Sequence, residues 1–290
     1  MIQCKNKEAY GQMNKKIKIT KGSVQETLII PLYARKMCCE KFPSLYYDAG
    51  AIKACNSLDY DFSDLNKKSK SVFYEFGALE GAMRQLDVMW EINDYLKSHK
   101  NASIVCLGCG LDIDPRRCGT KDNKIYNIDF KETINAREEL VGKDDREINI
   151  ATNINDLNWL DTIDNSNGTI LYAAGVFHYF KKEEVKALAI KIAEKLPGSR
   201  LIFDVVNDFG YKMMLKTVLK SYDMQDINAY FKTNDPKEFE TWTNKIKVSS
   251  RKYMRGYYDM KNKEVRSIHR ILADLADKML GMTIVRFDYD

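Results

Sequence analysis

The sequence lacks any apolar run of the roughly 18 residues that a membrane-spanning helix needs. Its first stretch, MIQCKNKEAYGQMNKK, contains no apolar segment of the kind that forms the core of a secretion signal. Internal repeats and low-complexity tracts are also absent. These absences predict a cytoplasmic globular protein without a membrane partner, and 290 residues are enough to bury a sizeable core.

A metal site is also not indicated. Seven cysteines are an odd number in a chain without an export signal, so we expect reduced thiols. Cys106, Cys109 and Cys118 lie close together in the sequence, but a fourth ligand with the spacing of a zinc site is missing. We therefore predict no metal and interpret these residues as small buried thiols.

The basic residues are spread along the chain. Lys and Arg number 46 against 41 Asp and Glu, which gives a net charge of +5. Short runs such as NKKSK are typical of a solvated surface rather than of a nucleic-acid patch. We therefore do not expect nucleic acid as a partner.

The pattern of apolar residues changes near residue 98. Residues 1–98 are predicted to be mainly helical, with a long amphipathic segment in SVFYEFGALEGAMRQLDVMWEINDYLKSH. From Ser103, five short strand-like runs alternate with amphipathic helices, which predicts an α/β fold with a doubly wound, Rossmann-like sheet. A helical insertion is expected at about 211–242, followed by two late strands with a helix between them.

The loop LGCGLD follows the first of these strands. Gly108 and Gly110 would let the backbone approach a ligand closely. A dinucleotide fingerprint would need a third glycine where Ile113 stands, so a pyrophosphate ligand is disfavoured. An ordinary turn between a strand and a helix explains the two glycines equally well.

Asp129 closes the next strand, in IYNIDF. A carboxylate at that point can accept hydrogen bonds from both hydroxyls of a ribose. The alternative is a helix N-cap for the segment FKETINA. Together, the glycine loop and this carboxylate indicate a nucleoside ligand more strongly than either does alone.

Two further loops carry suggestive residues. Asn153 could bond to an adenine edge while Ile154 packs on the ring, although a polar turn is an equal alternative. In AAGVFHYF, small residues including Ala174 would leave room for a ligand. His178 and Tyr179 follow at the mouth of the site, although a single histidine is more often structural.

These features fit S-adenosylmethionine, a nucleoside that carries no phosphate. Its amino-acid end has a carboxylate that needs a cation, and Arg84 precedes the first strand on the long helix. The alternative for Arg84 is a surface ion pair with Asp87, three residues further along the helix.

Several segments also resemble, in order, those of the leucine carboxyl methyltransferase family, in its bacterial branch typified by tetracenomycin polyketide O-methyltransferase. They lie between Val24 and Asp208 and comprise TLIIPLYAR, YYDAGA, MRQLD, IVCLGCGLDIDPRR, IYNIDFKETINARE, NINDLNW and GVFHYF. The resemblance implies a class I methyltransferase fold that uses S-adenosylmethionine. It also implies that residues 1–98 form a helical cap over the substrate, within one compact unit, and that residues 99–290 form the methyltransferase domain.

The resemblance implies a role for each matching residue. Arg84 would hold the donor's carboxylate, the glycines its amino-acid end, Asp129 its ribose, and Asn153 with Ile154 its adenine. Arg35, in the segment YAR, is a further candidate for a donor or substrate carboxylate. The expected donor-binding residues are Arg84, Gly108, Cys109, Gly110, Asp112, Asp129, Phe130, Asn153, Ile154 and Ala174.

Two positions depart from the family pattern. Asn153 stands where the family usually has Asp, and an amide still allows hydrogen bonding. Ala174 stands where the family typically has Glu, so a carboxylate near the methionine end of the donor is missing.

We therefore expect an O-methyltransferase that acts on a carboxylate or hydroxyl of a small molecule, including polyketide-like acceptors. A carboxylate is already anionic at neutral pH, whereas a phenol would need a base, for which His178 and then Tyr179 are the candidates. A methyltransferase for protein C-terminal carboxyl groups and a non-catalytic donor-binding protein are the alternatives. DNA methylation is disfavoured because AAGVFHYF has no proline, and metal-dependent catechol methylation because only Asp204 and Asp208 lie nearby.

Overall fold

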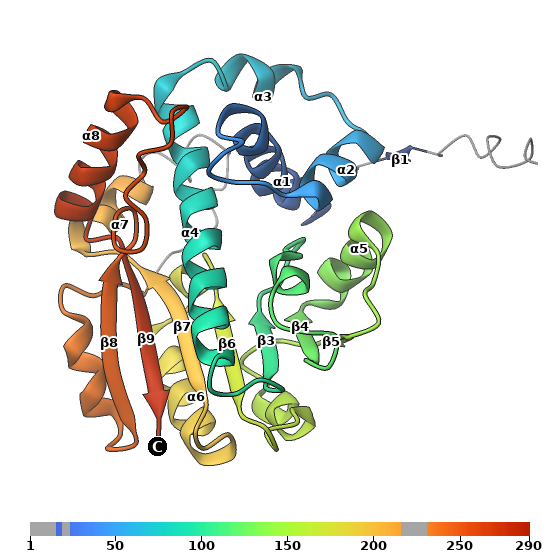
Figure 1. Ribbon diagram of the computed structural model, residues 1–290. Coiled ribbons are helices and arrows are strands. Elements are labelled where there is room, and N and C mark those ends of the chain that lie inside the picture. Colours follow the sequence, from blue (N-terminus) through green and yellow to red (C-terminus); the bar gives the residue numbers. More distant parts are fainter. Residues whose placement is uncertain (1–15, 19–23, 216–230) are drawn as a thin grey trace, which may run out of the picture.

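A seven-stranded sheet lies at the centre of the molecule (Figure 1). The computed structural model describes residues 16–18, 24–215 and 231–290. The strand order is β5-β4-β3-β6-β7-β9-β8. The strands are β3 (Ser103–Leu107), β4 (Ile125–Asp129), β5 (Glu147–Ala151), β6 (Thr169–Ala173), β7 (Arg200–Val205), β8 (Ile246–Lys252) and β9 (Thr283–Tyr289).

The strands from β3 to β7 pair in parallel, whereas β9 runs antiparallel to both of its neighbours. Every residue of β3 and β6 is buried, as expected for central strands covered on both faces. The predicted doubly wound sheet is confirmed. The reversed β9 was not predicted, because the alternation of strands and helices carries no information about the direction of a late strand.

The N-terminal part is mainly helical in its described residues. The helices are α1 (Val24–Lys41), α2 (Ala49–Ser57), α3 (Ser63–Lys68) and α4 (Val72–Leu96), and two short strands, β1 (Ile17–Lys18) and β2 (Leu58–Asp59), pair in parallel. In Figure 1 the helices α1, α2 and α3 lie above the carboxyl ends of the parallel strands. These helices, called the cap below, therefore lie over the edge at which doubly wound sheets in general bind their ligands.

Helix α4 belongs to both parts of the molecule. Leu79 and Met83, in its first half, pack in the hydrophobic core of the cap. Val88 and Ile92, in its second half, pack against the sheet in a core that includes Ile104 of β3. The middle of α4 is therefore held at the boundary between the cap and the ends of the strands.

Four further α-helices belong to the part of the chain that follows β3. They are α5 (Lys131–Val141), α6 (Lys182–Lys195), α7 (Asp208–Met214) and α8 (Ser267–Leu275). Of the predicted helical insertion, the described residues show α7 at the start and a 3₁₀ helix, Pro236–Trp242, at the end; residues 216–230 lie outside the described part. Within the described ranges, no helix combines the length and the apolar character needed to cross a membrane.

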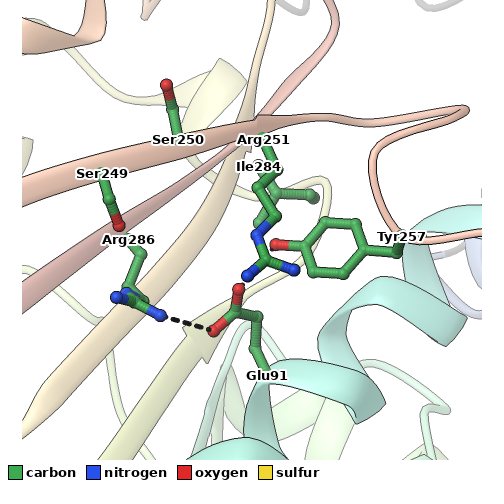
Figure 2. Close-up of a pocket in the computed structure, with 7 residues that line it drawn as sticks. All are labelled: Glu91, Ser249, Ser250, Arg251, Tyr257, Ile284 and Arg286. Carbon is green, nitrogen blue, oxygen red and sulfur yellow. Dashed lines mark hydrogen bonds and ion pairs between the residues drawn. The ribbon is translucent and has the colours of Figure 1, made fainter.

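A buried carboxylate joins α4 to the far strands of the sheet (Figure 2). Glu91 is only 1% exposed. It lies 3.4 Å from Arg200 of β7 and 3.6 Å from Arg286 of β9, and its other oxygen accepts a hydrogen bond of 2.7 Å from Tyr257. A small cavity lies beside this network, and Arg251 also lines it. The network therefore ties the sheet-covering half of α4 to β7 and β9.

Replacing Glu91 by alanine should leave Arg200 and Arg286 short of a buried partner. We expect the free energy of unfolding to fall by about 3–5 kcal/mol, the usual effect of removing one member of a buried ion pair. Urea denaturation followed by circular dichroism measures this, with Glu139→Ala on the exposed side of α5 as the control. An equal loss in both variants would contradict the assigned role of Glu91.

Candidate active site

The loops that follow the parallel strands meet at one edge of the sheet. The amide of Gly110, after β3, donates to the Oδ2 atom of Asp129 at the end of β4, over 2.9 Å. The amide of Thr152, after β5, donates to the carbonyl oxygen of Asp129. Val176, after β6, lies against Gly108. The structure thus brings together the four loops on which the predicted ligand site was based.

The glycine loop has a backbone that other residues would strain. Gly108 has a φ of +64° and Gly110 a φ of +47°. A Cβ atom on Gly108 would come within 2.7 Å of Val176, whereas one on Gly110 would meet only Leu28, at 3.6 Å. A four-residue 3₁₀ helix, Asp114–Arg117, follows instead of an α-helix. The loop therefore exposes bare backbone but lacks the helix N-terminus that a pyrophosphate uses.

Asp129 is held in one orientation by the backbone. Its Oδ2 atom accepts from Gly110, its Oδ1 atom accepts from Phe130 over 2.8 Å, and the side chain of Thr133 also bonds to this carboxylate. Burial raises the pKa of Asp129, although these three bonds lower it. The N-cap of α5 is Phe130, without a side-chain bond, so the helix-cap alternative for Asp129 is wrong. The Phe130 ring beside it is 57% exposed.

The loop after β5 presents one of its two predicted residues to solvent. Asn153 is exposed, and its Oδ1 atom accepts a 3.0 Å hydrogen bond from the amide of Asn155. Ile154 is buried in the core, and its carbonyl oxygen accepts from the indole of Trp159 over 3.0 Å. Asn153 is therefore accessible to a ligand, and Ile154 contributes mainly to packing.

Arg84 pairs with a carboxylate at the end of β7. Its Nη1 atom lies 3.2 Å from the Oδ2 atom of Asp204. The other oxygen of Asp204 accepts a 2.6 Å hydrogen bond from the amide of Gly175. Burial alone would raise the pKa of Asp204, but Arg84 and His178 hold it well below its usual range. The alternative of a surface ion pair between Arg84 and Asp87 is wrong, since Asp87 is fully buried.

Asp204 places a carboxylate next to Ala174, the position where the family typically has Glu. The amide that follows Ala174, that of Gly175, is bonded to Asp204, so a carboxylate lies at this edge although it comes from β7. From the sequence alone, Asp204 was only a possible metal ligand. A charged residue inside the apolar strand RLIFDV was the signal that pointed to its role.

His178 and Tyr179 differ in their surroundings. His178 is buried, and its Nε2 atom lies 3.1 Å from Asp204. Its Nδ1 atom is enclosed and has no hydrogen-bond partner within the described residues. Tyr179 is 48% exposed. Of the two predicted proton acceptors, only Tyr179 is open to solvent in this arrangement.

Comparisons with known proteins agree with this geometry. No family model matches the chain. The chain is 27% identical over 196 residues to the tetracenomycin polyketide synthesis O-methyltransferase TcmP of Streptomyces glaucescens, which covers 67% of this chain and 69% of TcmP. The predicted resemblance is confirmed.

Solved structures share the architecture. A DUF574 family protein from Streptomyces avermitilis superposes with a TM-score of 0.57 at 12% identity, over 89% of this chain and 97% of that protein. The plantazolicin methyltransferase BamL, solved with a triazolic desmethylPZN analogue and S-adenosylhomocysteine (SAH), gives a TM-score of 0.52 at 12% identity, over 92% of this chain and 99% of that protein. The fold is that of a class I methyltransferase.

Two predicted ligand residues are bonded to protein groups in this methyltransferase fold. Arg35 of α1 donates to Asp48 and to the carbonyl oxygen of Leu111, each over 3.0 Å. Asp112 accepts from the hydroxyl of Tyr172 over 2.9 Å. Both side chains are buried. Arg35 therefore links the cap to the glycine loop, and Asp112 anchors that loop on β6.

A second arginine, which was not among the predicted site residues, supports the glycine loop. Arg137 of α5 is fully buried and donates to the carbonyl oxygens of Asp112 and Gly110, over 2.5 and 3.3 Å. Its other nitrogen pairs with Glu147 at 2.7 Å. An arginine among the apolar residues of KETINAREELV was the available signal. Cys109, between the glycines, is buried, and burial raises the pKa of its thiol.

Gly108→Ala and Gly142→Ala form a matched pair for testing the loop. The two glycines have nearly equal φ angles, +64° and +65°, but only the Cβ atom at residue 108 would collide with Val176. We expect Gly108→Ala to lower the free energy of unfolding by about 1–3 kcal/mol more than Gly142→Ala, the usual effect of overpacking. Urea denaturation of both variants measures the difference, and equal losses would show that backbone conformation alone requires glycine here.

Proposed function

We propose that this chain is an S-adenosylmethionine-dependent O-methyltransferase that methylates a carboxylate or hydroxyl oxygen of a small, polyketide-like molecule. The observation that carries the proposal is the pair of bare glycines at the end of β3, bonded to a carboxylate at the end of β4. The similarity to TcmP, an O-methyltransferase of polyketide synthesis, supports the choice of reaction.

The chemistry of the residues at this edge fits the donor. Gly108 and Gly110 offer backbone to its amino-acid end, and Asp129 offers two oriented oxygens to its ribose. Phe130 and Asn153 offer an exposed ring and an amide beside the adenine. When bound, the donor supplies a methyl group on a positively charged sulfur.

Arg84 and Asp204 would set the charge around the sulfonium end of the bound donor. The Arg84 side chain is 25% exposed, so part of its guanidinium can meet the donor's carboxylate while Nη1 stays on Asp204. Asp204 remains ionised, and a fixed negative charge near a sulfonium favours its binding. Because Asp204 supplies a carboxylate at this edge, the loss of one at Ala174 is no longer an argument for a non-catalytic donor-binding protein.

The protein's contribution to such a transfer is mainly the positioning of the reactants and the exclusion of water. The cap helices above the strand ends fit that task. We assign His178 to orienting Asp204, since its Nε2 atom is engaged there and its Nδ1 atom is enclosed. Tyr179 lies at the mouth, where its hydroxyl can contact an acceptor.

Asp129→Asn should weaken the binding of S-adenosylmethionine by about 10-fold or more, because one oxygen that accepts from the ribose is replaced by a donor. Isothermal titration calorimetry with S-adenosylmethionine and with SAH measures the affinity. Asp122→Asn, at an exposed position before β4, is the control and should bind as the unmodified protein does. Unchanged affinity in Asp129→Asn would remove the basis of the proposed function.

A further inference from the structure

The guanidinium group of Arg84 lies against the backbone of Gly175, in the loop after β6. A Cβ atom at residue 175 would come within 2.5 Å of the Nη1 atom of Arg84 and within 2.9 Å of its Cζ and Nη2 atoms. These distances are shorter than any normal contact of a Cβ atom, so the guanidinium group fills the space that a side chain at residue 175 would need. The small residues of AAGVFHYF were expected to leave room for a ligand, but at Gly175 the room is taken by Arg84.

Asp204 bonds to both residues of this contact. Its Oδ1 atom accepts from the amide of Gly175 over 2.6 Å, and its Oδ2 atom lies 3.2 Å from the Nη1 atom of Arg84. His178 reaches the same Oδ2 atom over 3.1 Å. The carboxylate attracts the guanidinium group and the glycine gives it space, so the position of Arg84 depends on both residues.

Arg84 has further donors beyond this ion pair. Its Nε and Nη2 atoms form no hydrogen bond with any residue that the structure describes, and the Nε atom is enclosed. A guanidinium group presents its N–H donors as a rigid planar fork, which matches the two oxygens of a carboxylate. Because the fork is rigid, a small displacement of the group would misalign both bonds to such a ligand at once.

We propose that Gly175 is a positioning residue for the methyl donor. By lacking a side chain, it sets the place of the Arg84 guanidinium group and thereby the hydrogen bonds to the carboxylate at the donor's amino-acid end. The inference deepens the proposed function and rests on it. A larger residue at position 175 would displace the flexible end of Arg84 rather than the backbone of the fold. The loss should therefore appear in the binding of the donor.

The backbone gives a second reason for glycine at position 175. Gly175 has a φ of +70°, a conformation that favours glycine. Gly198, in the turn before β7, has nearly the same angle, +73°, but a Cβ atom there would meet nothing within 4 Å. Gly198→Ala therefore brings the backbone strain without the contact to Arg84, and it is the matched control.

Calorimetry with SAH and with 5′-methylthioadenosine tests the inference, because the second compound is a thioether nucleoside that lacks the amino-acid end. We expect Gly175→Ala to weaken the binding of SAH by about 10–100-fold, the usual effect of losing a hydrogen bond to a charged group. Its affinity for 5′-methylthioadenosine should stay within about 2-fold of that of the unmodified protein. Gly198→Ala should bind both compounds as the unmodified protein does.

A double-mutant cycle shows whether Gly175 acts through Arg84. Arg84→Ala should weaken SAH binding at least as much as Gly175→Ala does. Combining the two substitutions should cost no more affinity than Arg84→Ala alone, because the atoms that the new Cβ would meet are then absent. For the same reason, the double variant should fold even if Gly175→Ala alone does not, and circular dichroism measures this.

Two levels of failure are distinguishable. If the unmodified protein does not bind SAH, the proposed function fails. If it binds SAH, the inference about Gly175 is overturned by any of four results: Gly175→Ala binds SAH as Gly198→Ala does, Gly175→Ala weakens the binding of both compounds equally, the losses of the two single variants add in the double variant, or the double variant does not fold.

Discussion

The candidate active site depends on the hydrogen bond from the amide of Gly110 to the carboxylate of Asp129, at the edge of the sheet where the strand-end loops meet. It joins the ends of two neighbouring strands, so the loop after β3 cannot move without also displacing the carboxylate after β4. Arg137 of α5 and Arg35 of α1 also donate hydrogen bonds to backbone carbonyl oxygens of this loop. The bare backbone is therefore held in one shape from several directions before any ligand arrives.

Buried ion pairs join several parts of the molecule. Arg35 with Asp112 joins the cap to the glycine loop, Arg137 with Glu147 joins α5 to β5, and Glu91 joins α4 to β7 and β9. Such pairs add little net stability, because each charge loses its hydration on burial. Each of these pairs, however, constrains how its two elements are placed relative to one another.

The positions of the strands and of α5 could be predicted from the sequence, because they follow from the local alternation of apolar residues. The convergence of Gly110 and Asp129 could also be predicted, since parallel strands present their carboxyl ends at one edge. The partners of charged residues could not. Arg35 and Asp112 are candidate ligand residues in the sequence, and their bonds to Leu111 and Tyr172, which are distant in sequence, could not be foreseen. The pairing of Asp204 with Arg84 and His178 could not be predicted for the same reason.

The reversed strand β9 has a consequence for how the protein is made. It lies between β7 and β8 although it is the last of the three in sequence. While the chain is being synthesised, β8 has no partner in the sheet until β9 follows it. During that interval β7 presents an open edge, and an unpaired edge of a largely apolar strand is where chains join one another wrongly. Correct assembly therefore requires that β9 reach β7 before another molecule does.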